Sequence, residues 1–202
     1  MADINDVIIQ GVIVHKFVTP KVAILTISTG SATPTTNYPK VTFFEDVRTE
    51  VEEKFKEGDH VCIHGNIQSS KPKPDVKNQT MVAVFGESIE FTHSNMEEAF
   101  GVDVATSYKS FKNELKISGV VTRIECPTSN MVRLRVFTRK NGRPSFVPLV
   151  HFTRKPEEVL AKIHPQDRIC AIGSVQTEKK TIRDEIRYFE NYVVNEIVKE
   201  ED

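Results

Sequence analysis

A short stretch around position 40 carries residue types that could bind single-stranded nucleic acid. Val41 and Phe43 alternate with Tyr38, Lys40 and Phe44, and a strand places two such sets on opposite faces. Rings on an outer face can stack on bases while an ammonium group meets phosphate. The alternative reading is an ordinary strand of a β-sandwich with an aromatic residue at its rim.

Composition indicates a globular protein. The chain has 202 residues, of which 39% are hydrophobic and 27% charged, enough for one large domain or two small ones. No run of 18 apolar residues predicts a transmembrane helix, and the first residues are acidic where a signal peptide would be basic. No membrane association is therefore expected.

The cysteines and histidines predict neither disulfides nor a metal centre. Cys62, Cys126 and Cys170 form no Cys-x-x-Cys pair, and an odd number without a signal peptide favours reduced thiols. We expect a cytoplasmic location. Six scattered histidines show no ligand spacing, so no metal or cofactor is expected.

Charge is unevenly distributed along the chain. The net charge is −1, made of −3 over residues 1–91, −2 over 92–111 and +4 over 112–202. Any phosphate binding must therefore come from a local surface and not from the total charge.

The sequence contains an internal repeat at an offset of 108 residues. Three separated blocks keep this register, and only the second strand of each copy needs an offset of 109. Identical pairs in this register include Gly11/Gly119, Asp59/Asp167, Cys62/Cys170, Gly65/Gly173 and Gln68/Gln176. Such a repeat indicates a domain duplication. We expect one domain over residues 1–91, a linker over 92–112 and a second domain over 113–202.

Each copy reads as five strands with one helix between the third and the fourth. The strands expected in the first copy are Val7–Val14, Val22–Thr29, Tyr38–Phe44, His60–Gln68 and Thr80–Phe85 continuing at Ser88–Phe91. Those of the second are Leu115–Ile124, Met131–Thr138, Phe146–Phe152, Arg168–Thr177 and Ile186–Glu190 continuing at Tyr192–Ile197. The helices are Asp46–Lys56, which Gly58 could close, and a segment starting near Pro156. This order, with glycines that let strands bend, predicts a mainly-β protein of two tandem oligonucleotide-binding (OB) barrels.

Basic residues gather in the polar hairpins that the pattern predicts. These are residues 30–37 and 139–145 between the second and third strands, and 71–77 and 178–183 between the fourth and fifth. Three of the four are basic, through Lys71, Lys73, Arg139, Lys140, Arg143, Lys179 and Lys180. Basic turns are often merely solvated, but their matching places suit a surface that follows phosphates.

Strand parity assigns the outer face of each copy. The second copy should point Arg133, Arg135 and Phe137 outward from one strand, and Phe146 and Phe152 from the next. Two rings six residues apart lie about 20 Å apart on an extended strand, which would offer separate platforms for bases. The alternative is that a dimer partner or the other barrel covers the rings.

Three segments resemble the bacterial single-stranded DNA-binding protein family. Asn5–Gly11 is similar to its opening Asn-x-Val-Ile-Leu-x-Gly strand, Tyr38–Phe44 to its Trp-x-Arg-Val-Val-x-Phe strand, and Phe55–Gly65 to its Leu-x-Lys-Gly-x-x-Val-x-(Val/Ile)-x-Gly segment. The resemblance implies an OB fold that wraps single-stranded DNA without sequence preference, in replication, recombination or repair. It assigns stacking to Tyr38 and Phe44 and, through the repeat, to Phe146 and Phe152.

The chain also departs from that family. It has no tryptophan, and a third stacking position falls near Pro72 and Lys180, neither of which is aromatic. The family's acidic tail with a terminal Pro-Phe has no counterpart beyond Glu200-Glu201-Asp202, so recruitment of partners through a tail is not expected. Tandem copies resemble the two-domain members, which build four barrels from a homodimer. A phage or mobile-element origin fits so diverged a sequence, and a phage-encoded chain would be expected in the host cytoplasm.

The sequence also bears on two other classes of function. An OB-fold module for protein interaction or RNA binding, in a replication or transfer complex with replication or recombination proteins, stays open because the choice between DNA and RNA depends on room for a 2′-hydroxyl. An enzyme is not expected, since the sequence has no paired-carboxylate motif, Gly-rich phosphate loop or nucleophile motif.

Overall fold

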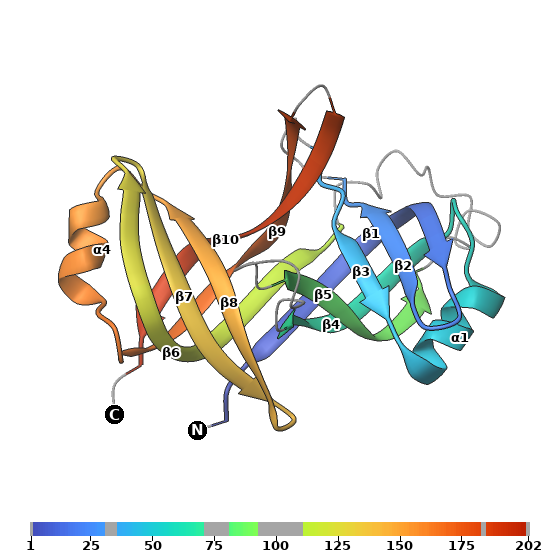
Figure 1. Ribbon diagram of the computed structural model, residues 1–202, viewed down its shortest axis with the longest axis horizontal. Coiled ribbons are helices and arrows are strands. Elements are labelled where there is room, and N and C mark those ends of the chain that lie inside the picture. Colours follow the sequence, from blue (N-terminus) through green and yellow to red (C-terminus); the bar gives the residue numbers. More distant parts are fainter. Residues whose placement is uncertain (1, 31–35, 71–80, 93–110, 183–184, 201–202) are drawn as a thin grey trace. The chain divides into compact units, whose positions relative to one another are not determined.

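The computed structural model describes residues 2–30, 36–70, 81–92, 111–182 and 185–200 (Figure 1). The chain divides into two compact units. We call residues 7–66 and 84–113 the N-terminal unit, and residues 1–6, 67–83 and 114–202 the C-terminal unit. Two segments of the first sequence copy thus belong with the second copy. The sequence-based division at 92–112 stays a prediction, and residues 93–110 lie outside the described residues.

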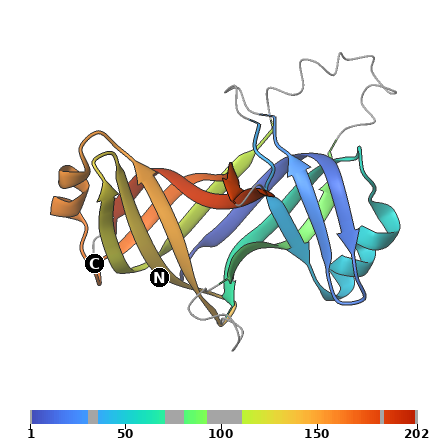
Figure 2. The ribbon, with the colours of Figure 1, turned by 45° about the horizontal axis from the view of Figure 1, so that its top comes forward.

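The N-terminal unit is built on a closed five-stranded barrel. Its strands are β1 (Asn5–Val18), β2 (Ala23–Ser28), β3 (Lys40–Phe43), β4 (His60–Ser70) and β5 (Met81–Phe91). They are paired in the order β1-β2-β3-β5-β4, and β4 returns to β1 (Figures 1 and 2). The prediction of a mainly-β protein with an OB-type barrel is confirmed at this level.

The C-terminal unit repeats these pairings. Its strands are β6 (Asn113–Thr128), β7 (Met131–Lys140), β8 (Arg143–Phe152), β9 (Arg168–Ile182) and β10 (Glu185–Lys199). β6 pairs with β7 and β9, β7 with β8, β8 with β10 in parallel, and β10 with β9. β9 and β10 form a long antiparallel ribbon, with register pairs that run from Ile169 opposite Lys199 to Ile182 opposite Glu185 (Figure 1).

Alternation along the strands separates the core from the outer face. The buried apolar residues of β2, β3, β7 and β8 are at most 2% exposed, and they are Ala23, Leu25, Ile27, Val41, Phe43, Val132, Leu134, Val136, Val147 and Leu149. Val41 and Phe43 thus share the inner face, opposite to Lys40, as their alternation predicts. Burying them drives the strands to curl around a core, and it fixes which side chains reach the surface.

Matching irregularities bend the first strand of each unit. The register shifts between Ile13 and His15 in β1, and between Val121 and Arg123 in β6. Just before each shift, a Cβ on Gly11 or Gly119 would lie 2.2 or 2.1 Å from a carbonyl oxygen of the neighbouring strand. Glycine at this position therefore allows the close approach that closes a small barrel.

One helix follows the third strand of each unit. α1 (Glu45–Lys54) buries Val51, and Lys16 Nζ donates hydrogen bonds to three carbonyls at its C-terminal end. An ammonium group there satisfies carbonyls that the helix leaves unpaired. α4 (Pro156–Lys162) begins at the proline that the sequence indicated. Within the described residues, neither helix is long and apolar enough to cross a membrane.

Three predictions about the first copy were wrong in detail. Its third strand is shorter than expected, because Tyr38 precedes β3 and Phe44 is the N-cap of α1. The fifth strand is continuous, since Gly86 stays in β5 and its missing Cβ leaves room for the ring of Phe43. Gly58 does not close α1: the helix ends at Phe55, and the positive φ of Gly58 belongs to the following turn.

Two hairpins of the second copy were predicted too long. Strand pairing continues through residues 139–145, and Asn141 and Gly142, both with positive φ, make the turn. Pairing between β9 and β10 continues through Lys179 and Lys180 to Ile182. Polar side chains suggested loops here, but a strand ladder needs only backbone groups, so it tolerates polar residues on solvated strands.

Candidate nucleic-acid interface

The outer face of β7 and β8 alternates cations with rings. Arg133, Arg135 and Arg139 are exposed on β7, with Phe137 between the last two, and Phe146 lies opposite Phe137 on β8. We call these five residues the Arg–Phe row. The buried set of β7 leaves the alternate positions to solvent, so the same core that shapes the barrel lines up the row.

The rings and guanidinium groups of the row are in contact distance. The centroids of Phe137 and Phe146 are 5.2 Å apart, with the ring planes inclined by 54°. Arg135 lies 5.4 Å from the centroid of Phe146, and Arg139 lies 5.9 Å from that of Phe137. Cation–π contacts at these distances hold charge beside the rings. A base on either ring would therefore have a cation beside it for its phosphate.

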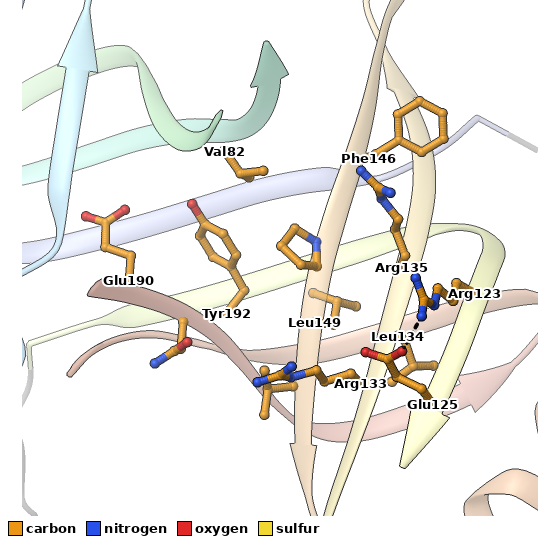
Figure 3. Close-up of a pocket in the computed structure, with 13 residues that line it drawn as sticks. Val82, Arg123, Glu125, Arg133, Leu134, Arg135, Phe146, Leu149, Glu190 and Tyr192 are labelled. Carbon is orange, nitrogen blue, oxygen red and sulfur yellow. Dashed lines mark ion pairs between the residues drawn. The ribbon is translucent and has the colours of Figure 1, made fainter. Parts of the chain in front are cut away.

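A cavity of about 450 Å³ adjoins the row (Figure 3). Arginines of β6 and β7 line one side together with Phe146, and Glu190 and Tyr192 of β10 lie on the other. Pro148 of β8 and Asn191 of β10 also line the cavity. Its size lies in the range of small-molecule sites, and its lining mixes one ring face with cations and amide or carboxylate groups. The cavity could accept a nucleobase with its sugar.

Tyr192 gives this cavity an unused polar atom. Its side chain is 3% exposed, and its hydroxyl has no hydrogen-bond partner among the residues that the structure describes. Burial raises the pKa of Tyr192, so the hydroxyl stays neutral and can both donate and accept. A buried hydroxyl without a partner is costly, and a ligand that supplied one would recover that cost.

Arg123 and Glu125 form the ion pair drawn at the edge of the cavity. Their charged atoms are 2.8 Å apart, and Arg123 stays 71% exposed (Figure 3). Across the strands, Arg123 lies opposite Arg135 and Glu125 opposite Arg133. Neighbouring guanidinium groups repel each other, so an anion between them would be stabilised.

The basic residues predicted on hairpins have different positions. Lys140 Nζ is 2.8 Å from Asp6 Oδ1, so a carboxylate already neutralises it. Lys180 pairs with Glu178 at 3.0 Å and lies 5.6 Å from the ring centroid of Phe189, and its hydrogen bond lowers the pKa of Glu178. Arg143 and Lys179 are exposed on strands. Lys71 and Lys73 lie outside the described residues.

The N-terminal unit presents its rings differently. Tyr38 is 40% and Phe44 41% exposed, as their predicted outward direction requires, and Lys40 is exposed at the start of β3. Phe44 stacks on Phe85 of β5 with centroids 5.3 Å apart and planes inclined by 11°. In the C-terminal unit Phe152 is 57% exposed, at the far end of β8 from Phe146.

Sequence reasoning missed several residues of these surfaces. Arg123, Glu190, Asn191 and Tyr192 lie on strands whose partners could not be read from spacing alone. Phe85 was assigned to a strand without an outer role. Phe189, beside Lys180, places a ring near the third stacking position that the sequence lacked. Phe189 could have been found by looking for an aromatic residue on the strand expected to pair with that of Lys180, because paired strands bring such residues together.

Comparison with known proteins finds likeness in structure only. No family model and no curated protein matches the sequence. Solved structures do match the fold, and two of them are crystal structures of the single-stranded DNA-binding protein from Thermus aquaticus: the wild type, with a TM-score of 0.70 and 15% identity, and a deletion variant, with 0.68 and 14%. Each match covers 100% of this chain and 95% or 96% of the other. The chain thus has the fold of that protein along its whole length.

Proposed function

We propose that the chain binds single-stranded DNA without sequence preference. The Arg–Phe row carries the proposal, since it combines two exposed or half-buried rings with three arginines on one strand pair. Rings stack on any base and guanidinium groups meet phosphate, so neither contact depends on sequence. The likeness in fold to a single-stranded DNA-binding protein supports it.

The row and its cavity suggest how a strand lies on the C-terminal unit. Bases stack on Phe146 and Phe137 while Arg135 and Arg139 meet the phosphates beside them. One nucleotide enters the cavity, where the hydroxyl of Tyr192 takes a hydrogen bond from or gives one to its base. Tyr38, Lys40 and Phe44 provide a second platform in the N-terminal unit, with the exposed Arg143, Phe152 and Lys179 as outer contacts.

The finer assignments follow from this proposal. We take both units as OB barrels in tandem, with a homodimer supplying four barrels, in a cytoplasmic protein of replication, recombination or repair. No catalytic step is involved. With about 4–16 nucleotides for each barrel, one chain should cover roughly 8–32.

Fluorescence anisotropy with oligo-dT, oligo-rU and a duplex of equal length, each at two salt concentrations, tests the proposal. We expect oligo-dT to bind more tightly than the duplex and its affinity to fall with salt, because binding releases counterions. Tighter binding of oligo-rU than of oligo-dT would indicate that the chain binds RNA instead of DNA. Equal affinity for the duplex, or no dependence on salt, would contradict the proposal.

A further inference from the structure

Three side chains of the kinds that bind metal ions converge on two neighbouring strands of the N-terminal unit. Cys62 and His64 lie on β4, and Glu90 lies on the neighbouring β5. The sulfur, an imidazole nitrogen and a carboxylate oxygen all lie within 4.8 Å of one another. Residues two apart on a strand share a face, and strand pairing brings the third residue beside them. We propose that these residues form a binding site for a zinc-type divalent cation.

The distances suit one ion held by all three. Cys62 Sγ and His64 Nε2 are 3.7 Å apart. Tetrahedral zinc bonds of about 2.3 Å to sulfur and about 2.0–2.1 Å to nitrogen put those two atoms about 3.6 Å apart. Sulfur and nitrogen are thus already at ligand spacing. The carboxylate of Glu90 needs only a side-chain rotation, since it is exposed.

The donor set selects the class of metal. A thiolate, an imidazole and a carboxylate suit zinc and the related late transition metals, whereas magnesium and calcium prefer oxygen donors alone. Three protein ligands leave the fourth tetrahedral position to water. Cys62 is 5% exposed while His64 and Glu90 are exposed, so the site is anchored in the barrel and open to solvent on one side.

The backbone around the site is held in place. β4 pairs with β1, with Gln10 opposite Cys62 and Ile8 opposite His64, and its other neighbour is β5. Side chains on a strand paired at both edges keep their spacing, which lowers the cost of collecting ligands around an ion.

The second copy provides an internal control. Cys170 repeats Cys62, but Ile172 stands in place of His64, and Val198 lies opposite Cys170 on β10. The second copy thus has the cysteine but neither the histidine nor the glutamate. The remaining cysteine, Cys126, is exposed and donates to the carbonyl of Thr128. Only the site at Cys62 should therefore bind a metal through sulfur.

Titration of the reduced, metal-free full chain with Co²⁺ tests the proposal by absorption spectroscopy. We expect a sulfur-to-cobalt charge-transfer band and visible bands of a four-coordinate ion, saturating at one ion per chain and displaced by Zn²⁺. Cys62→Ser should abolish the charge-transfer band. His64→Gln and Glu90→Gln should each weaken Co²⁺ binding. The loss should exceed roughly 10–100-fold, which is the cost of removing a residue that only hydrogen-bonds to a metal ligand.

Cys126→Ser and Cys170→Ser are the matched controls and should keep the band. Loss of the band in either control but not in Cys62→Ser, or no band in the wild-type chain, would overturn the proposal. If Cys62→Ser does not fold, His64→Gln decides, because that side chain is exposed: Zn²⁺ should raise the Tm of the wild type and not that of the variant. No nucleic acid is present, so the result is independent of the proposed function.

Discussion

In both units, two backbone hydrogen bonds tie the turn before the fourth strand to the first strand, with lengths of 2.8 and 2.9 Å in each. The residues are Gly58, Ile13 and Asp59 in the N-terminal unit and Gln166, Val121 and Asp167 in the C-terminal unit, all at an offset of 108. The carboxylates of Asp59 and Asp167 accept equivalent hydrogen bonds of 2.8 Å from the backbone. The frame of the two copies is therefore the same.

Their outer faces differ. Where β2 turns Ile24 and Thr26 outward, β7 turns Arg133 and Arg135 outward. The N-terminal unit has the Cys62 site and a stacked Phe44–Phe85 pair, while the C-terminal unit has the Arg–Phe row and its cavity. Core packing and strand pairing limit which residues can occupy the buried positions, whereas the outward positions are limited mainly by what they bind. Function should therefore divide between the units, with phosphate binding concentrated in the second.

Replacing both rings of the Arg–Phe row should have the largest effect. Phe137→Leu with Phe146→Leu keeps the packing but removes the stacking, which is worth about 1–3 kcal/mol for each base. We expect a loss of about 2–6 kcal/mol in oligo-dT binding by anisotropy. Tyr38→Leu with Phe44→Leu should cost less, because β2 offers no arginine beside those rings. An equal or larger loss in the second variant would reverse the comparison.

Neutralising the arginines should change the salt dependence. Arg133→Gln, Arg135→Gln and Arg139→Gln together should lower the slope of log affinity against log salt by about 2, at about 0.7 for each phosphate contact. Lys54→Gln, Lys155→Gln and Lys162→Gln, on or beside the helices, remove the same charge and should leave the slope nearly unchanged. Equal slopes for the two triple variants would show that the arginines serve solubility instead.

Tyr192→Phe should stabilise the free protein and weaken DNA binding. Removing a buried hydroxyl without a partner should raise the free energy of unfolding by about 1 kcal/mol, and losing its bond to a nucleotide should cost about 0.5–1.5 kcal/mol of binding. Urea denaturation and anisotropy measure the two effects. Unchanged binding would exclude the cavity from the interface.

The pH dependence of stability checks that Tyr192 is buried and neutral. Its folded pKa is raised, so above the unfolded value of about 10 only the unfolded chain ionises at this position. Stability should therefore fall as pH rises there, by up to about 1.4 kcal/mol for each pH unit. The Tyr192→Phe variant should lose this contribution, which urea denaturation between about pH 9 and 11 would show.

Exchange of the turn residues should have the smallest effect. Gly58 and Gln166 have φ values of 93° and 80°, a region that costs a residue with a Cβ about 1–2 kcal/mol. Gln166→Gly should raise the free energy of unfolding by about 0.5–1 kcal/mol, because the relief of backbone strain exceeds the extra conformational entropy that glycine loses on folding. Gly58→Gln should lower the free energy of unfolding by a similar amount. Urea unfolding measures both. Stabilisation by Gly58→Gln would mean that the two turns differ.

Much of this fold could be read from the sequence because its signals are local. Alternation placed Leu25, Leu134 and their neighbours in the core and set which rings and arginines face outward. Strand ends were less predictable, since Lys179 and Lys180 look like turn residues but continue the β9–β10 ribbon.

The candidate site was predicted only where it depends on one strand. Partners that come from distant strands left no local signal: Asp6 neutralises Lys140, and Tyr192 closes a cavity against residues of β6 and β7. The sulfur, imidazole and carboxylate of the Cys62 site were likewise invisible in the spacing, because Glu90 reaches them only through sheet pairing.

The membership of residues 1–6 in the C-terminal unit has a consequence for synthesis on the ribosome. Asp3 pairs with Arg168 at 2.8 Å, and the backbone of Ile4 hydrogen-bonds to Ser118, so these residues need partners that the ribosome makes much later. At about 5–20 residues per second, the segment around Asp3 waits roughly 10–30 s for Arg168. Until then it stays exposed to chaperones and proteases, so the order of translation, and not only the sequence, bears on the yield of folded protein.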